Sequence, residues 1–341
     1  MNKLSESVID FCSDIGGDAF LVQGAGGNVS WKDDDTLWIK ASGTWLSEAK
    51  HKEIFLPVDL AHLRSSIDDG DFSVTPMLIK RSKLKPSIET LLHALMPHKI
   101  VVHLHAVEIL AHLVRSDFHE TFNRLLGDKV SWCYVDYFKP GLELARAVHL
   151  ELSLKPNVEV VFLRNHGVVI GGNTVDDIYI ILKTLNDSLK TPVNATLTLL
   201  PSTNEVLSFP QLSELQYHLA DDPQLHALAK IPELISMVKK SWAMFPDHVV
   251  FLGPQSVCGG FNDVLTLLTT NKTVRPPFIF VEQVGVFQHQ LNTRAQADQL
   301  NCYYEVLVRQ TTAGYLTILE EHDINALMNW DAEKYRQTLS K

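Results

Sequence analysis

The hydrophobic and polar positions of the chain predict short apolar strands that alternate with amphipathic helices. Residues 100–106 and 158–163 are runs rich in β-branched residues, which is typical of buried strands. Apolar residues at helical spacing predict helices over residues 57–68 and 87–96, and after a capping-box pattern that begins at Thr174. Strands that alternate with helices in this way favour an α/β fold with helices layered on a sheet.

The alternating pattern is interrupted between residues 191 and 212. Three prolines stand there among many Ser, Thr and Asn residues, and such a composition is typical of a domain boundary. A length of 341 residues also exceeds that of one typical domain. We therefore expect two domains, residues 1–205 and residues 206–341, of which the second is a smaller α/β domain.

Three histidines stand at the ends of predicted strands. His103 and His105 are two residues apart in one strand, so their side chains point to the same face, about 7 Å apart along the strand. His166 ends the other strand and precedes Gly167, which leaves room where the backbone passes close to another group and permits a positive φ at a turn. A lone His-x-His is weak evidence, because core histidines are common.

A carboxylate adds to this set, since Glu89 stands in the first turn of the helix predicted over residues 87–96. Three imidazoles and one carboxylate suit a zinc site with an open coordination position. Nitrogen donors without a thiolate favour Zn²⁺, with Mn²⁺, Co²⁺ and Fe²⁺ as alternatives. The sequence therefore predicts a divalent metal site.

Five short motifs that contain these residues resemble the class II aldolase/adducin family, over roughly residues 1–200. The resemblance implies a three-layer class II aldolase-like domain, a mixed β-sheet between helices, followed here by the smaller C-terminal α/β domain. The motifs, in chain order, are Gly24–Ser30, Ala41–Thr44, Pro86–Glu89, His103–His105 and Asn165–Gly167.

The resemblance also implies roles for the motif residues. In the family, the histidines at positions 103, 105 and 166 bind the metal, and the glutamate at position 89 serves the aldolases as general acid/base. It implies a metal-dependent lyase that cleaves a ketose or ketose phosphate by retro-aldol chemistry, active as a homo-oligomer, a dimer or tetramer. The residues that would contact substrate are Asn28, Ser42, Gly43 and Ser87.

Two departures from the family pattern leave the substrate open. Ala25 and Ile88 stand where sugar-phosphate aldolases carry hydroxyl residues that help to bind phosphate. An epimerase, a dehydratase or a decarboxylase on the same scaffold is an alternative, although the resembled epimerase has an aspartate at the place of Glu89. A non-catalytic adducin-like binding module is a further alternative, which loss of the histidines would favour.

Composition narrows the class of protein. A net charge of −10 without a cluster of Lys and Arg argues against a nucleic-acid partner; the small-molecule sugar or sugar-phosphate substrate is what the family resemblance implies. Four scattered cysteines are typical of reduced thiols. No apolar run approaches the roughly 20 residues of a membrane span and no signal peptide is apparent, so we expect a cytoplasmic protein without a membrane partner. Carbohydrate metabolism is what the family resemblance implies for it.

The C-terminal part also carries a possible internal repeat. Residues 278–287 match residues 160–169 in type and order: an apolar strand, a polar step, a glycine and a second strand, with a helix after each. We expect a partial copy of the first domain with Val284 at the place of His166, and a match of residues 248–254 to the strand at 36–42. The alternative is chance, because this pattern recurs in α/β proteins.

Overall fold

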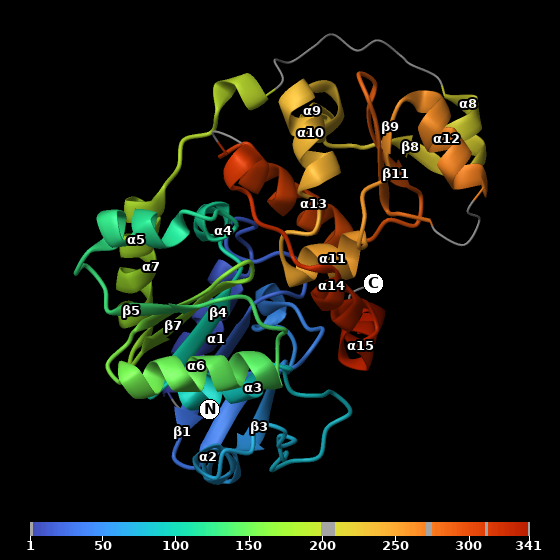
Figure 1. Cartoon of the computed structure of the whole chain (residues 1–341). Helices are drawn as coiled ribbons and strands as arrows, with labels where there is room; N and C mark the ends of the chain where they lie inside the picture. Colours follow the sequence, from blue (N-terminus) through green and yellow to red (C-terminus); the bar gives the residue numbers. More distant parts are fainter. Residues whose placement is uncertain (1–2, 199–208, 271–274, 311–312, 340–341) are drawn as a thin grey trace.

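The protein is described by a computed structural model over residues 3–198, 209–270, 275–310 and 313–339. These residues contain a seven-stranded sheet from the first part of the chain and a four-stranded sheet from the second. Figure 1 shows the larger sheet in blue to green and the smaller one in yellow to orange, each with helices around it. The predicted α/β class with a smaller second part is confirmed. The expected boundary at residues 205 and 206 lies outside the described residues.

The larger sheet is built from the strands β1 (Asn28–Asp33), β2 (Thr36–Lys40), β3 (Phe55–Asp59), β4 (Ile100–Leu104), β5 (Trp132–Val135), β6 (Val160–Leu163) and β7 (Gly167–Gly172). Their order is β3-β2-β1-β4-β7-β6-β5, and all neighbours are antiparallel except β5 and β6. The strand β4, which contains His103 and is followed by His105, is therefore the central strand of a mixed sheet.

Helices cover both faces of this sheet: α1 (Lys3–Ile15), the short η1 (Leu46–Glu48), α2 (Leu60–Asp68), α3 (Thr90–Leu95), α4 (Val107–Leu113), α5 (Phe118–Leu126), α6 (Leu142–Leu154), α7 (Val175–Leu189) and the short η2 (Ala195–Leu197). Val102 of β4 packs in the core with α1, α4, α5 and α7, whereas Val101 packs with α3 and α6. Successive strand residues point to opposite faces, so one buried strand serves both cores. The predicted layered arrangement is confirmed.

Two helices begin later than predicted. Within residues 57–68 the chain first completes β3, and α2 begins only after Asp59, whose side chain accepts a hydrogen bond of 2.8 Å from a backbone N–H in the first turn. The helix predicted over residues 87–96 likewise begins after Glu89. Here the Ser87 hydroxyl accepts a hydrogen bond of 3.2 Å from the Glu89 backbone N–H, which forms a turn before α3.

The second part of the chain contains strands β8 (Tyr217–Leu219), β9 (Cys258–Gly259), β10 (Phe278–Val281) and β11 (Gly285–His289). Figure 1 shows its central helices between the small sheet and the first part of the chain. The helices are α8 (Pro210–Glu214), η3 (Pro223–His226), α9 (Ala227–Lys230), α10 (Pro232–Lys240), α11 (Pro246–Leu252), α12 (Phe261–Thr270), α13 (Arg294–Leu307), η4 (Ala313–Tyr315), α14 (Glu321–Met328) and α15 (Asp331–Leu339).

The smaller sheet has the topology that the predicted partial copy requires. Its order, β8-β11-β10-β9, repeats the order β4-β7-β6-β5, and the last pair is parallel in both sheets. The turn before the glycine contains a residue with positive φ in both cases, Asn165 (52°) and Gln283 (62°). The following helices, α7 and α13, both begin with a capping box, at Thr174 and Thr293.

Strand register identifies the residues of the copy that correspond to the three histidines. His103 pairs with Val169 in the larger sheet, and Leu219 pairs with Phe287 at the matching place in the smaller one. By this alignment Leu219, Asp221 and Val284 stand where the first part has His103, His105 and His166. The copy therefore keeps the fold of the site but not its imidazoles.

The prediction for one segment of the copy is wrong. Residues 248–254 do not form a strand, because residues 246–252 are the helix α11, with Pro246 in its first turn. Every residue of α11 is buried, and a short apolar run of this kind has the same pattern in a buried strand and in a buried helix.

The two parts of the chain pack against each other in one hydrophobic cluster, to which both contribute residues. Val107, Leu110 and Val114, from α4 and its end, pack among residues of the C-terminal part. The Asn165 side chain donates hydrogen bonds to the carbonyls of Met244 (2.8 Å) and Thr317 (3.0 Å). Among the described residues, the helices all lack the length and apolarity needed to cross a membrane.

Candidate functional site

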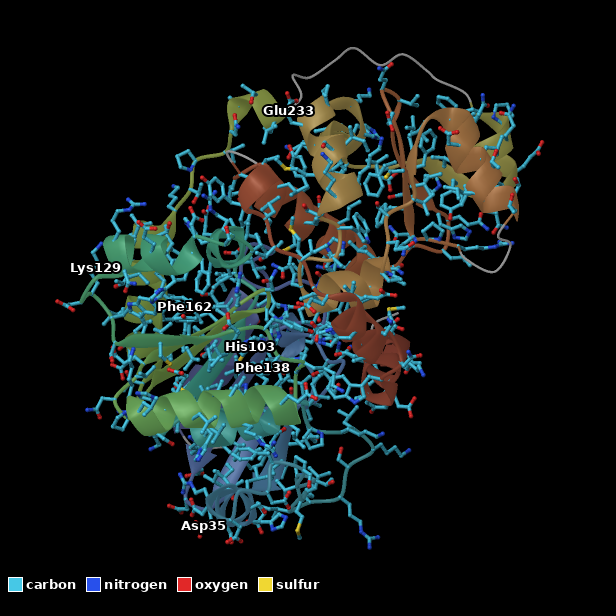
Figure 2. All side chains as sticks on the ribbon, viewed as in Figure 1. Asp35, His103, Lys129, Phe138, Phe162 and Glu233 are labelled. Carbon is cyan, nitrogen blue, oxygen red and sulfur yellow. The ribbon has the colours of Figure 1, made fainter. Side chains whose placement is uncertain are left out.

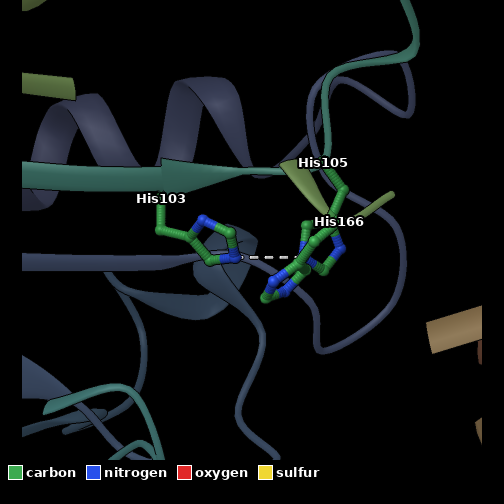
Figure 3. A group of neighbouring side chains, drawn as sticks. All are labelled: His103, His105 and His166. Atoms are coloured by element: carbon green, nitrogen blue, oxygen red, sulfur yellow. Dashed lines mark hydrogen bonds between the residues drawn. The ribbon is translucent and has the colours of Figure 1, made fainter. Parts of the chain in front are cut away.

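The three predicted histidines meet at one point. His103, His105 and His166 are buried, and one ring nitrogen of each lies within 4.8 Å of those of the other two. The Nε2 atoms of His103 and His105 are 3.1 Å apart, and Figure 3 shows the three rings turned toward one another. Figure 2 places His103 near the middle of the molecule, at the level where the first part meets the C-terminal helices.

The ends of the central strands bring these side chains together. His103 is in β4, His105 follows this strand, and His166 is in the turn between β6 and β7. A Cβ at Gly167 would lie 2.4 Å from the Leu104 carbonyl oxygen and 3.2 Å from the His103 ring, so the glycine is required by this close approach. The predicted close approach is thus present, but the positive φ of the turn belongs to Asn165 (52°).

Burial favours the neutral form of two of the imidazoles, those of His103 and His166. Nδ1 of His103 donates a hydrogen bond of 3.1 Å to the Val168 carbonyl, which leaves the Nε2 lone pair directed at the other two rings. Burial lowers the pKa of His103 well below its usual value and lowers the pKa of His166 to about 3. Neutral imidazoles with a directed lone pair are the form in which histidine binds metals.

Glu89 joins the histidine cluster. Its two carboxylate oxygens lie 3.5 Å from Nε2 of His103 and 3.5 Å from Nε2 of His166. One of them, Oε2, accepts a hydrogen bond of 2.8 Å from the Asn28 side chain, while Oε1 is buried without a hydrogen-bond partner among the described residues. Burial raises the pKa of Glu89 to about 7.

Two of the four predicted substrate contacts, Asn28 and Ser87, bind Glu89 in the structure. The Asn28 amide holds its carboxylate, and the Ser87 hydroxyl accepts from its backbone N–H. Both side chains are buried, with exposed fractions of 7% for Asn28 and 5% for Ser87. The structure thus brings both residues to the site, in roles that fix the position of the carboxylate.

Of the other two predicted contacts, Ser42 and Gly43, the glycine lies against the C-terminal helix α15. A Cβ at Gly43 would be 2.8 Å from Cβ of Leu339 in α15. The buried Lys40 precedes them and donates hydrogen bonds to the carbonyls of Ala25 (3.2 Å) and Thr44 (2.7 Å). It therefore ties the glycine-rich loop to the Ser-Gly loop, and burial lowers the pKa of Lys40 to about 7.

Sequence reasoning missed three charged residues near the site. Lys40 stands directly before the Ala41–Thr44 motif, so its place beside a loop was visible in the sequence.

Asp247 and Arg336 come from α11 and α15, and no motif marked either of them. Oδ2 of Asp247 lies 3.4 Å from Nδ1 of His105, and its other oxygen accepts from the Arg336 guanidinium. Burial would raise the pKa of Asp247, but the adjacent Arg336 charge outweighs burial and holds it well below the usual range.

The donor set fits a divalent metal. Three buried imidazoles converge beside a carboxylate that has a buried oxygen without a hydrogen-bond partner among the described residues, and such an oxygen is costly without a ligand. Nitrogen and oxygen donors of this kind are those of mononuclear zinc and related sites. The four cysteines are free thiols, so no disulfide joins them.

Two proteins of known sequence show how the chain relates to others. It is 31% identical over 189 residues to the L-fuculose phosphate aldolase of Methanocaldococcus jannaschii, covering 51% of this chain and 87% of that protein. It is 28% identical over 181 residues to the uncharacterized oxidoreductase YuxG of Bacillus subtilis, but this match spans 48% of the chain and only 26% of YuxG.

Among solved structures, the N-terminal class II aldolase domain of a conserved protein from Thermoplasma acidophilum is similar, with 25% identity and a TM-score of 0.45 over 55% of this chain and 93% of that one. The model of the Class II Aldolase and Adducin N-terminal domain family matches residues 6–193, which contain all five sequence motifs. By this match, which covers more than half of its length, the chain belongs to the class II aldolase and adducin family.

Proposed function

We propose that this protein is a metal-dependent lyase that cleaves a ketose by retro-aldol chemistry. The observation that carries the proposal is the meeting of three buried imidazoles and the Glu89 carboxylate at one point. The ligands would be His103, His105 and His166. Zn²⁺ suits this set best, and Mn²⁺, Co²⁺ or Fe²⁺ suit it less well.

Glu89 would move the protons of the reaction. A retro-aldol cleavage takes a proton from the hydroxyl beside the breaking C–C bond and returns a proton to the carbon that is left behind. A divalent ion held by the histidines supplies a Lewis acid that polarises the substrate carbonyl. Asn28 holds the Glu89 carboxylate through Oε2. The other oxygen of Glu89, Oε1, has no hydrogen-bond partner among the described residues, so Oε1 would take and return the proton.

A sugar or sugar phosphate is the proposed substrate class. Support comes from the aldolase relatives, whose names give L-fuculose phosphate as their substrate. The loop at Ser42 and Gly43 would contact the polar end of the substrate, but α15 covers it through Leu339. Asn28 and Ser87 would contact the substrate beside Glu89, which both residues also hold in place. A substrate phosphate would bind at this loop only where α15 leaves the loop accessible.

Two further proposals concern the assembly. Residues 1–205 would form the catalytic domain, and residues 206–341 would form a second domain that covers the site, because α11 and α15 lie against it. The protein would act as a homo-oligomer, a dimer or tetramer, and light scattering of the purified protein measures its mass. A monomer that is fully active at high dilution would contradict the oligomer.

The function is tested by metal content and by a substrate panel. Alanine at any one of His103, His105 or His166 is expected to remove most bound metal, as measured by elemental analysis, because each would supply one ligand. Alanine at His322, which is 75% exposed, is the control for nonspecific binding and should leave the metal content unchanged. The wild-type protein is expected to cleave at least one ketose or ketose phosphate. Full metal occupancy in the triple-alanine variant would reject the metal centre, and a metal-loaded protein that cleaves none would reject the lyase.

A further inference from the structure

We propose that Asp247, from the C-terminal part of the chain, is a positioning residue that holds His105 in the form that binds metal. The proposal rests on the metal centre proposed above and adds a residue that none of the five motifs contains. Asp247 would touch neither the metal nor the substrate, and would act only through the His105 ring.

The geometry of the His105 ring supports this role. Its Nδ1 lies 3.4 Å from Oδ2 of Asp247, whereas its Nε2 lies on the other side, 3.1 Å from Nε2 of His103. A neutral imidazole has one N–H and one lone pair. A carboxylate at Nδ1 favours the proton there, which leaves the lone pair on Nε2, the nitrogen that faces the cluster. Carboxylates that accept from metal-bound histidines in this way fix the tautomer and the ring orientation.

The Asp247 carboxylate is itself held in place. Its side chain is 4% exposed, and three donors from separate segments surround it: His105, Gln299 at 3.4 Å and the Arg336 guanidinium. Arg336 is also paired with Glu333, at 2.9 Å. A carboxylate fixed from several sides can orient the ring that it contacts, whereas a mobile one cannot.

The glycine-rich loop leaves room for this contact. A Cβ at Gly26 would lie 3.0 Å from Oδ2 of Asp247 and 3.2 Å from Nδ1 of His105. Even the smallest side chain at this position would press on both groups. This close approach gives Gly26 a role that does not involve a substrate, namely to let a residue of α11 reach a histidine at the end of β4.

The other two histidines do not need a partner from the C-terminal part. His103 is oriented by the Val168 carbonyl, which belongs to the neighbouring strand β7, and Nδ1 of His166 has no partner among the described residues. Within the part of the chain that the structure describes, His105 is thus the only one of the three whose ring nitrogen contacts a side chain from outside positions 6–193, the segment that matches the family.

A purely structural role is the competing explanation. In that case Asp247 serves to neutralise the buried Arg336, and its removal would destabilise the protein without a specific effect on metal binding. The two explanations differ for asparagine at this position. An amide oxygen still accepts from His105, but an amide carries no charge to neutralise a guanidinium.

The test is the Zn²⁺ affinity of the full-length, metal-free protein, measured by competition with a chromogenic chelator. Asp247→Ala is expected to weaken Zn²⁺ binding about 10–100-fold, the usual effect of losing such a partner. Asp247→Asn is expected to restore most of this loss. Glu333→Gln is the matched control: it removes a carboxylate from the same ion-pair network without touching His105, and should leave the affinity within about twofold of wild type.

His105→Ala separates failure of this inference from failure of the metal centre. If His105→Ala does not weaken Zn²⁺ binding, the metal centre itself is rejected. If His105→Ala weakens it but Asp247→Ala does not, only the role of Asp247 is rejected. Equal losses in Asp247→Ala and Glu333→Gln would also overturn it. The Co²⁺ absorption spectrum gives a second readout, because loss of orientation at His105 should change the ligand field in Asp247→Ala and not in Glu333→Gln.

Discussion

At the residue scale, the site depends on how firmly one carboxylate is held. Glu89 is 6% exposed, lies 3.5 Å from two imidazoles and accepts a hydrogen bond from Asn28. Its backbone N–H is bound by the Ser87 hydroxyl. Such support fixes the carboxylate beside the imidazoles, and among the described residues it leaves one oxygen without a hydrogen-bond partner.

Glu89→Gln is therefore expected to lower turnover about 10²–10⁴-fold, the range for loss of a general acid/base. The amide keeps the shape of the side chain but cannot exchange the proton, so bound metal and the circular dichroism spectrum should stay as in wild type. Glu159→Gln, at the residue directly before β6, is the control and should leave turnover unchanged. Wild-type turnover of Glu89→Gln on the substrate found in the panel would contradict the proposed role.

A second residue, His248, affects stability rather than chemistry. Its ring is fully buried against Trp242, Phe245 and Tyr303, with ring centroids 4.3, 5.5 and 4.5 Å away. Neither ring nitrogen has a hydrogen-bond partner among the described residues. Burial lowers the pKa of His248 from 6.5 to about 3, so the folded protein holds this ring neutral where the unfolded chain would protonate it.

It follows that His248 makes the protein less stable in acid. Between pH 6.5 and about 3 the unfolded chain binds more protons at this ring, so the free energy of unfolding falls as the pH falls. His248→Phe should reduce this loss, measured by urea unfolding at about pH 7 and about pH 5. His322→Phe, at a 75% exposed position, is the control. An unchanged pH dependence in His248→Phe would contradict the explanation.

The sequence predicted the residues of the site that lie in short contiguous motifs. His103, His105, His166 and Glu89 could be identified because strand ends and helix starts converge in a layered α/β fold. The partnership of His105 with Asp247 could not be predicted, because it joins residues far apart in the chain through the packing of α11. A buried aspartate in an apolar run carries no local signal of its partner.

At the element scale, the periodicity of the sequence predicted strands and helices well where the two patterns differ. The central strand β4 and the capped helix α7 are where they were expected. The pattern failed for α11, where every residue is buried and neither alternation nor a polar face separates helix from strand. It also failed to place helix starts where a side chain caps the turn, as Asp59 does for α2.

The capping box of α7 gives a prediction at this scale. Thr174 accepts a hydrogen bond of 3.1 Å from the Asp177 backbone N–H, and Asp177 accepts from the Thr174 backbone N–H at 2.9 Å. Thr174→Ala is expected to lower the free energy of unfolding by about 0.5–2 kcal/mol, measured by urea denaturation. The matched control in the same helix is Thr184→Ala, where alanine replaces a hydroxyl that bonds only the Ile180 carbonyl, and a loss as large there would contradict the capping explanation.

At the scale of the whole molecule, the two sheets are coupled through α4. Leu110 of this helix is fully buried and packs in the core of the C-terminal part, while Ile109 of the same helix packs in the core of the larger sheet. One helix that serves two cores should make the two parts unfold together.

Leu110→Ala is expected to lower the free energy of unfolding by about 2–5 kcal/mol, the cost of a cavity in a buried core. Hydrogen exchange with mass spectrometry should then show the same loss of protection in β4 and β10, because both depend on α4. Leu150→Ala, at a position that is 61% exposed, is the control. Loss of protection in β10 alone would show that the two parts unfold independently.

The contact between Asp247 and His105 also has a consequence for the order of events during synthesis. The ribosome adds about 5–20 residues per second, so the first part of the chain can fold before the later segments exist. All three histidines are made before Asp247, and Arg336 follows 89 residues after it. A metal ion bound at this stage would be held by a His105 ring that lacks its contact with the Asp247 carboxylate. We therefore expect nascent chains stalled before residue 247 to bind zinc more weakly than the released protein. Tight retention of the metal would then begin only after Asp247 and Arg336 have been made.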